Sequence, residues 1–234
     1  MINIHNKVGK IDDKQSIFDS YNNFLMSDDR YVFFKLCSRI NFFNLVKELN
    51  GDIVECGVFK GAGMLVWLKL INMYQPHSIK KVIGFDHFDN NFVNNIENVV
   101  DRDAMMQVFS RDKNLKPSDI SIEEITKKFL DCGFIDKNFE LVKGDISNTS
   151  KTFLVDRPGF RISLLYLDLD LDKPTYDTLC NFWERIVSGG IVVFDEYAFH
   201  GWSEANAVDR FLKEKNLKLI NTHLTSPTAF IRKD

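Results

Sequence analysis

The sequence predicts an α/β domain built on a mostly parallel β-sheet with helices on both faces. Three observations predict it. Short apolar segments of strand length alternate with segments of helical periodicity over most of the chain. The apolar segments are continuous rather than alternating, which is typical of parallel strands covered on both faces. The 234 residues are enough for one sizeable domain of this kind, so we expect a single domain over residues 1–234.

The first 50 residues are expected to be helical. Asn50-Gly51 is a helix-stop signal that would end this segment. Its aromatic side chains would also suit a self-association surface, which makes a homo-oligomer one expectation. Apolar side chains recur at roughly helical spacing, at Tyr31, Phe34, Leu36, Phe42, Leu45, Val46 and Leu49.

The elements after residue 51 follow the alternating pattern in order. Strands are predicted at residues 52–58, 81–85, 139–142, 162–167 and 191–194, and two further apolar segments lie at 217–224 and 228–231. Helices are predicted at 64–73, 121–130, 175–186 and 205–215, with a turn at Ser188-Gly189-Gly190. Residues 87–137, after the second strand, are polar and irregular apart from the helix predicted at 121–130.

Composition and charge exclude several classes of protein. Apolar residues make up 44% and charged residues 27% of the chain, an ordinary globular balance. The net charge of −3 argues against nucleic acid as the main partner, because nucleic-acid-binding proteins usually carry an excess of basic residues. No apolar run approaches the roughly 18 to 20 residues that span a bilayer, and the first ten residues lack a secretory h-region. The four cysteines are far apart, so we expect reduced thiols and a cytoplasmic protein without membrane partners.

A glycine-rich turn follows the first predicted strand. It contains Val58 and Phe59, and its glycines are Gly57, Gly61 and Gly63, a GxxxGxG spacing that differs from the GxGxxG of nicotinamide-binding folds. Glycines allow a ligand to approach the backbone closely, and the following helix presents free N–H groups. Glu55, two residues before the first glycine, would suit a cationic amino-acid ligand better than a pyrophosphate. The alternative is a purely structural turn.

Acidic residues end the next two strands. Asp86 comes 29 residues after Gly57, where a carboxylate can accept hydrogen bonds from ribose hydroxyls. Asp145, after the third strand, could accept from an adenine amino group. Either residue alone could instead be a cap or turn residue. Their common place at the strand ends, together with the glycine turn, favours a cofactor pocket.

A denser acidic cluster follows the fourth and fifth strands. Asp168 and Asp170 alternate with leucines, so strand periodicity would put both on one face. Asp195 and Glu196 end the next strand, and four neighbouring carboxylates would repel one another unless a cation or a proton lay between them. Oxygen ligands without His or Cys favour Mg²⁺ or Ca²⁺. Asp172 is interpreted as the cap of the following helix.

The segment after the fifth strand is expected to border the same cleft, with His200, Trp202 and Glu204. His200 is a candidate proton acceptor, because imidazole titrates near neutral pH. The alternative is a solvated loop histidine.

These motifs resemble those of the macrocin O-methyltransferase family. The resemblance rests on residues 55–61, on the Leu-Asp-Leu-Asp run with Pro174-Thr175, and on Gly189-Gly190 with Asp195-Glu196-Tyr197, and it extends from about Arg30 to the C-terminus. It implies a Rossmann-like class I methyltransferase fold with a seven-stranded sheet. It also implies S-adenosylmethionine and Mg²⁺ as cofactors, and lids over the acceptor formed by residues 1–50 and 87–137.

The same resemblance implies roles for single residues. Asp168 would be a metal ligand and the general base, and Asp195 and Glu196 the remaining metal ligands. Glu55, the glycine turn, Asp86 and Asp145 would form the cofactor pocket. The hypothesis is methylation of a sugar hydroxyl on a nucleotide sugar or glycoside, in natural-product or surface-glycan biosynthesis. The alternatives are a metal-dependent methyltransferase of catechols or other vicinal diols, a non-catalytic nucleotide-binding module, and a nicotinamide oxidoreductase, which the glycine spacing disfavours.

Overall fold

The computed structural model describes residues 15–111, 113–224 and 226–234, and the chain divides into two compact units between Cys37 and Ser38. The first unit contains α1 (Gln15–Met26), which has no buried residue. It also contains the first part of α2 (Arg30–Val46), whose remaining residues belong to the second unit. The rings of Phe24 and Phe33 lie 6.2 Å apart there. Helices in this part of the chain are therefore confirmed for the described residues, although the second helix ends at Val46 rather than at Asn50-Gly51.

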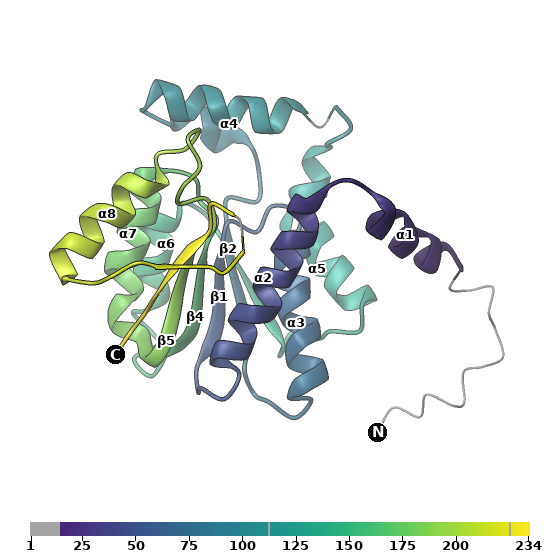
Figure 1. Ribbon diagram of the computed structural model, residues 1–234, viewed down its shortest axis with the longest axis horizontal. Helices are drawn as coiled ribbons and strands as arrows, with labels where there is room; N and C mark the ends of the chain where they lie inside the picture. Colours follow the sequence, from purple (N-terminus) through teal and green to yellow (C-terminus); the bar gives the residue numbers. More distant parts are fainter. Residues whose placement is uncertain (1–14, 112, 225) are drawn as a thin grey trace. The chain divides into compact units, whose positions relative to one another are not determined.

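The second unit is built on a seven-stranded sheet in the order β3-β2-β1-β4-β5-β7-β6 (Figure 1). The first five strands run parallel, and β7 is antiparallel to both β5 and β6. The predicted fold class, a mostly parallel sheet with helices on both faces, is confirmed. The strands are β1 (Asp52–Cys56), β2 (Val82–Asp86), β3 (Phe139–Lys143), β4 (Ile162–Leu167), β5 (Ile186–Phe194), β6 (Ile220–Asn221) and β7 (Ala229–Arg232).

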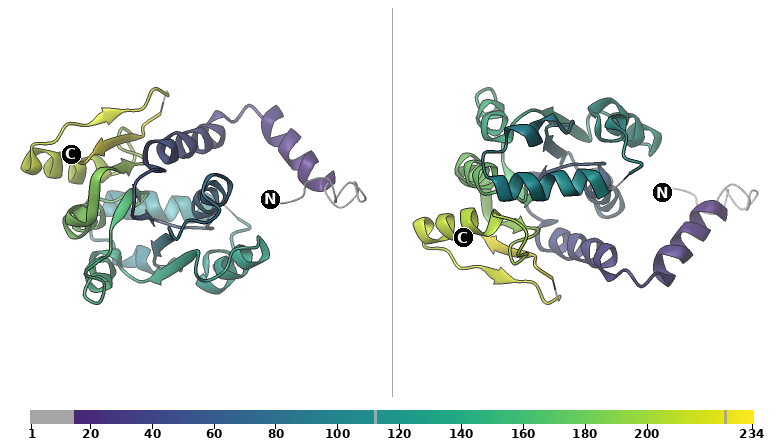
Figure 2. Two further views of the ribbon diagram at one scale, coloured as in Figure 1. Left: turned by 90° about the horizontal axis from the view of Figure 1, so that it is seen from below. Right: turned by 90° about the horizontal axis from the view of Figure 1, so that it is seen from above.

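Helices cover both faces of the sheet and bury two apolar cores against it (Figures 1 and 2). On one face, residues 38–46 of α2 pack with α3 (Ala62–Tyr74) and α5 (Ile122–Asp131) around Trp67 and Phe129. On the other face, α6 (Ile146–Phe153), α7 (Asp172–Phe182) and α8 (Glu204–Lys215) pack around Phe182 and Phe211. Within the described residues, every helix is too short or too polar to cross a membrane.

The glycine pair before the fifth predicted strand lies inside that strand, so the predicted turn at Ser188–Gly190 is wrong. β5 begins at Ile186, after the short 3₁₀ helix η5 (Trp183–Arg185) that ends α7. Gly189 N–H donates to the Lys233 carbonyl at 2.7 Å, and Lys233 N–H donates to the Gly190 carbonyl at 2.9 Å. Glycines in a strand often mark an irregularity of this kind, and the register of β4 against β5 shifts here.

The insertion at residues 87–137 contains more helix than predicted. Besides α5 it holds α4 (Val99–Arg111) and two 3₁₀ helices, η3 (Asn91–Asn95) and η4 (Pro117–Ile120). Figures 1 and 2 show α4 lying across the carboxyl end of the sheet. Because α4 buries only Asp101 and Met105, its sequence shows little apolar periodicity. Asp101 Oδ2 accepts a hydrogen bond from Ser203 Oγ at 2.6 Å, which ties the insertion to the start of α8.

Candidate active site

The glycine turn, Asp168 and Asp195 lie where the strand order changes direction. From β1, the chain continues to β2 and β3 on one side, and β4 and β5 lie on the other. Ligands of parallel sheets bind at such a switch point, beyond the carboxyl ends of the strands. Main-chain hydrogen bonds continue past the strand ends, from Gly57 N–H to Phe85 (2.9 Å), from Asp168 N–H to Cys56 (2.8 Å) and from Asp195 N–H to Leu167 (3.0 Å). The glycine turn, Asp168 and Asp195 are thus set side by side by the backbone.

Each glycine of the turn is required by its surroundings. Gly57 has a φ of +91°, and a Cβ atom there would lie 1.9 Å from the carbonyl oxygen of Asp168. Gly61 has a φ of +85° and packs against α5. A Cβ atom on Gly63 would lie 2.2 Å from Glu55 Oε1. Contacts within the protein therefore account for all three glycines of the turn.

Asp86 fastens the glycine turn to the end of β2. Its Oδ2 accepts hydrogen bonds from Val58 N–H at 2.7 Å and from Phe59 N–H at 2.9 Å. Its Oδ1 accepts from Phe88 N–H at 3.1 Å. Phe59 lies at a φ of 49°, a left-handed conformation that these bonds help to hold. The carboxylate predicted to bind ribose thus organises the turn in this structure.

Glu55 lies in a buried polar group on the face of the sheet covered by α2 and α3. The side chain of Glu55 is 1% exposed. Trp67 Nε1 donates to its Oε2 at 2.5 Å, and Arg39 Nη2 lies 3.7 Å from its Oε1. Glu55 thus has protein partners of its own, an indole and a guanidinium, where a cationic ligand was expected.

Carboxylates gather at the ends of β4 and β5. Asp195 and Glu196 are buried, at 1% and 8% exposure, and Asp168 is half-buried. The hydroxyl of Tyr166, which lies wholly inside the protein, donates to Asp195 Oδ1. Burial, and then the charge of Asp195, raise the pKa of Tyr166 well above its usual value. Tyr166 therefore remains a neutral phenol that donates to the carboxylate.

Asp170 departs from the alternation predicted for the Leu-Asp-Leu-Asp run. β4 ends at Leu167, and Asp170 has a φ of 65°, so strand periodicity does not extend to Asp168 and Asp170 and the prediction that it places both on one face is wrong. A left-handed residue turns the chain towards α7 and away from the extended conformation. The carbonyl of Asp170 accepts from Glu204 N–H at 3.1 Å. This bond brings the first residue of α8 to the acidic cluster.

Glu204 is the most deeply buried carboxylate of the site, at 0% exposure. Within the described residues neither of its oxygens has a hydrogen-bond partner that meets normal geometry. Burial, followed by the charges of Asp170, Asp195 and Asp168, raises the pKa of Glu204 well above its usual value. A buried carboxyl group without hydrogen-bond partners is stable when it is protonated or when a cation binds beside it.

The donor chemistry of the cluster fits a hard divalent cation, because it consists of oxygen ligands and includes the buried Glu204 carboxyl. The side chains are not gathered as ligands, however. Over residues 15–111, 113–224 and 226–234, no three His, Cys, Asp or Glu side chains converge closely enough to hold an ion. Binding a cation would therefore require side chains of the cluster to turn towards it.

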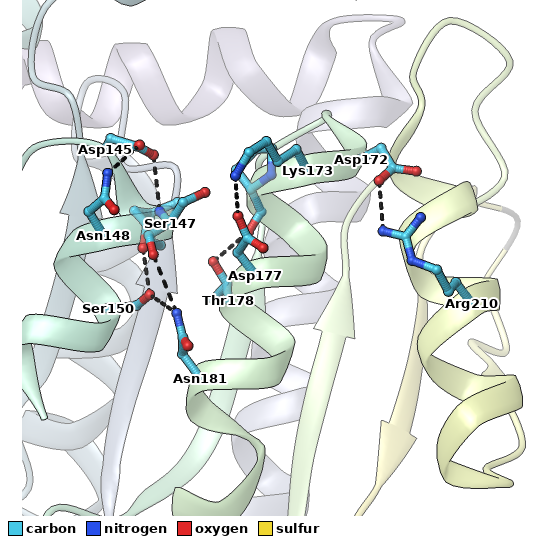
Figure 3. A network of polar contacts seen from close by, with 12 residues as sticks. Asp145, Ser147, Asn148, Ser150, Asp172, Lys173, Asp177, Thr178, Asn181 and Arg210 are labelled. Atoms are coloured by element: carbon cyan, nitrogen blue, oxygen red, sulfur yellow. Dashed lines mark hydrogen bonds and ion pairs between the residues drawn. The ribbon is translucent and has the colours of Figure 1, made fainter.

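Two of the predicted aspartates act at helix ends (Figure 3). Asp145 is exposed and caps α6, accepting from Ser147 N–H at 3.0 Å and from Asn148 Nδ2 at 2.9 Å. Asp172 was predicted to cap α7, and this is wrong, because it is the first residue of the helix and Leu171 is in the cap position. The Asp172 carboxylate instead pairs with Arg210 Nη2 at 2.9 Å. A carboxylate in the first turn still suits the helix dipole.

Sequence reasoning placed His200 near the site and missed Arg39 and Trp67. His200 is an exposed residue of the segment between β5 and α8. Arg39 is buried on α2, where Phe42, Phe43 and Val46 are also buried. A charged residue at helical spacing from three apolar ones was a signal that could have found it. Trp67 carried no such signal, since it belongs to a uniformly apolar helix.

Fold and strand-end geometry together define a class I methyltransferase fold. A calicheamicin methyltransferase, CalS11, matches with a TM-score of 0.71 and 25% identity over 92% of this chain and 85% of that chain. The O-methyltransferase NovP matches with a TM-score of 0.70 and 23% identity over 85% of this chain and 79% of that one.

The family follows from the sequence match. The model of the macrocin O-methyltransferase (TylF) family matches residues 39–233, and the chain belongs to this family. A Streptomyces olivaceus relative, 8-demethyl-8-(2,3-dimethoxy-alpha-L-rhamnosyl)-tetracenomycin-C 4'-O-methyltransferase, is 27% identical over 69% of this chain. Demethyldecarbamoylnovobiocin O-methyltransferase of Streptomyces niveus is 26% identical over 63% of it. The matches span 58% and 53% of the lengths of these two proteins.

Proposed function

We propose that the protein is an S-adenosylmethionine-dependent O-methyltransferase that methylates a sugar hydroxyl of a glycoside or a nucleotide sugar. The observation that carries the proposal is the contact between the glycine turn at Gly57 and the strand end at Asp168, which brings a cofactor turn against a carboxylate. Family membership and the rhamnosyl compound in the name of one relative support the sugar acceptor. Biosynthesis of a natural product or of a surface glycan is the setting that we propose.

The cofactor pocket is assigned to the carboxyl ends of β1, β2 and β3. The turn at Gly57, Val58, Phe59, Gly61 and Gly63 would accept the amino-acid end of the cofactor, since its backbone allows close approach. Asp86 would accept from the ribose hydroxyls and Asp145 from the adenine amino group, while Glu55 would supply negative charge near the ammonium group. When bound, S-adenosylmethionine supplies a methyl group activated by a sulfonium.

Asp86 and Asp145 can keep their present bonds in this role. Asp86 accepts three backbone N–H groups, and a carboxylate has about four lone-pair positions. Asp145 is exposed at the start of α6 and has acceptor capacity beyond its two bonds. Neither residue would have to leave its partners to meet a cofactor.

The acceptor is assigned to the acidic cluster after β4 and β5. Asp168 is the proposed general base, which takes the hydroxyl proton as the acceptor oxygen bonds to the methyl carbon and the carbon–sulfur bond breaks. Tyr166 orients Asp195 beside it. Asp168, Asp195 and Glu196 are the residues that would hold Mg²⁺, which lowers the pKa of a bound hydroxyl. His200 is a second candidate for the proton.

The experiment combines calorimetry with S-adenosylhomocysteine and a methyl-transfer assay on nucleotide-sugar and glycoside acceptors. Asp168→Ala should abolish turnover while leaving S-adenosylhomocysteine affinity within a few fold of wild type. Asp156→Ala, at an exposed aspartate outside the cluster, is the matched control and should keep full turnover. Wild-type protein that transfers no methyl group to any acceptor would contradict the proposal. Undiminished turnover in excess chelator would contradict the assignment of Mg²⁺.

A further inference from the structure

Arg39 is a buried cation placed between the two halves of the site. Its guanidinium carbon lies 4.4 Å from the centre of the Tyr166 ring and 5.7 Å from that of Trp67. Its Nη2 lies 3.7 Å from Glu55 Oε1, and the residue is 7% exposed. A buried guanidinium is stable only when charges and aromatic faces compensate for the lost water. The compensation here comes from both the cofactor side and the acceptor side.

The charge of Arg39 is fixed by its neighbours. Burial acts to lower the pKa of Arg39, but the hydroxyl of Tyr166 and the carboxylates of Glu55, Asp195 and Asp168 outweigh this effect, and the pKa is raised. The guanidinium thus stays cationic among these carboxylates. Its Nε–H is buried without an acceptor in the described part of the chain, so the aromatic face and the Glu55 pair hold it in place.

Two of these contacts lead to the acidic cluster. Glu55 and Tyr166 are register partners on the neighbouring strands β1 and β4, so one guanidinium can meet both. The hydroxyl of Tyr166 donates to Asp195 Oδ1. Arg39 on the ring face restricts the tilt of the Tyr166 ring, and the ring in turn fixes the orientation of the Asp195 carboxylate.

We propose that Arg39 is a positioning residue for methyl transfer, which orients Asp195 through Tyr166 and holds Glu55 beneath the glycine turn. The inference rests on the proposed function, because Asp195 is assigned to the acceptor side there. Because Arg39 is buried, it would act through these two residues and not by contact with a reactant. Its effect is to preorganise two carboxylates that would otherwise repel each other and the neighbouring Asp168. A lysine would keep the charge but lose the planar group that stacks on Tyr166.

The test uses three variants of the full chain, Arg39→Met, Arg39→Lys and Tyr166→Phe. Arg157→Met is the matched control, because Arg157 also stacks on an aromatic ring, 3.7 Å from the centre of Phe153, and pairs with Glu140 at 2.8 Å. Turnover is measured as kcat and as KM for acceptor and for S-adenosylmethionine separately. The ¹H–¹⁵N resonance of the Trp67 indole, assigned with Trp67→Phe, reports on Glu55 without any reactant.

Both Arg39→Met and Tyr166→Phe are expected to lower kcat/KM for the acceptor by about 10- to 100-fold, the range found for residues that orient ligands or bases. Tyr166→Phe should leave KM for S-adenosylmethionine unchanged and the Trp67 resonance in place. Arg39→Met should shift that resonance, because Arg39 lies over the Trp67 ring and both residues contact Glu55. Arg39→Lys should lower kcat/KM for the acceptor less than Arg39→Met does. The control should behave as wild type in all readouts.

Two results would overturn the inference. The first is folded Arg39→Met protein with acceptor kcat/KM within twofold of wild type. The second is a loss that merely follows the unfolded fraction measured by circular dichroism. If Arg39→Met does not fold, unchanged acceptor kinetics in Arg39→Lys and Tyr166→Phe would overturn it equally. Failure of the proposed function is a different result, since wild-type protein would then transfer no methyl group.

Discussion

Gly57 and Asp168 are in backbone contact, so closely that a Cβ atom on Gly57 would lie 1.9 Å from the carbonyl oxygen of Asp168. The two residues follow neighbouring parallel strands, and Asp168 N–H donates to the carbonyl of Cys56 at 2.8 Å. The glycine turn and the residue that follows β4 are therefore in direct contact at the switch point of the sheet. A displacement of either residue must move the other.

Gly57→Ala should destabilise the protein strongly. The φ of +91° disfavours a side chain, and the clash is with backbone that cannot turn aside. We expect the free energy of unfolding in urea to fall by about 2–5 kcal/mol, the sum of strain and overpacking. Gly133→Ala is the control, since its φ is +88° and no atom lies within 4 Å of the added Cβ. It should cost only about 1–2 kcal/mol, and equal losses would show that the contact with Asp168 does not matter.

Trp67→Phe should remove more stability than its change of volume explains. Trp67 Nε1 donates to the buried Glu55 carboxylate at 2.5 Å, and hydrogen bonds to charged groups contribute about 1.5–3 kcal/mol. Trp183→Phe makes the same change in the opposite core, at a tryptophan that is also buried. Denaturant unfolding of both variants should give a difference of about that size. Equal destabilisation would contradict the buried indole–carboxylate bond.

The strands were predictable wherever a continuous apolar run is flanked by polar residues at both ends. β4 was predicted with its observed limits because Arg161 precedes it and Asp168 follows it. β5 was predicted too short because Gly189-Gly190 has the composition of a turn, whereas its backbone pairs with the C-terminal end of the chain. That pairing joins residues about forty positions apart, and local sequence propensity carries no information about such a contact.

The site was predictable to the extent that it lies at strand ends. Asp86 ends its strand, and Asp168 and Asp195 directly follow theirs, so a parallel sheet must bring them to one edge. The partners of Glu55 were not predictable, because they come from two helices whose packing decides the contact. Arg39 and Trp67 meet it only after both helices cover the same face of the sheet.

Asp86→Asn should loosen the glycine turn and weaken cofactor binding together. The carboxylate accepts from Val58 and Phe59 through one oxygen and from Phe88 through the other. An amide would turn its NH₂ group towards one of these sets of donors, so we expect a loss of about 1–3 kcal/mol in unfolding free energy. Calorimetry should show weaker binding of S-adenosylhomocysteine.

Asp145→Asn is the comparison for that prediction. Asn caps helices about as well as Asp, so stability should change by less than about 0.5 kcal/mol. If Asp145 accepts from the adenine amino group, the variant still offers one carbonyl oxygen and should bind S-adenosylhomocysteine within a few fold of wild type. Equal losses of affinity in both variants would contradict the separate role assigned to Asp86.

The buried Lys80 should make stability depend on alkaline pH. Its Nζ donates to the Leu49 carbonyl and to Ser163 Oγ, both at 2.9 Å. These three residues lie at the amino ends of β1, β2 and β4, at the other end of the parallel strands from the site. Burial lowers the pKa of Lys80 to about 8, against the charges of Asp52 and Glu48. In the unfolded chain the same amine titrates near 10.4.

The sign follows from proton binding. Between pH 8 and about 10.4 the unfolded chain holds a proton that the folded protein has released, so the free energy of unfolding rises with pH across this window. Below the window both states are protonated and Lys80 contributes no slope. Lys80→Met removes this titration, so wild type should gain stability relative to the variant from pH 8 to 10, by up to about 1.4 kcal/mol per pH unit. Urea unfolding of both proteins at pH 7, 8, 9 and 10 measures the gain, and a difference that stays constant with pH would contradict the lowered pKa.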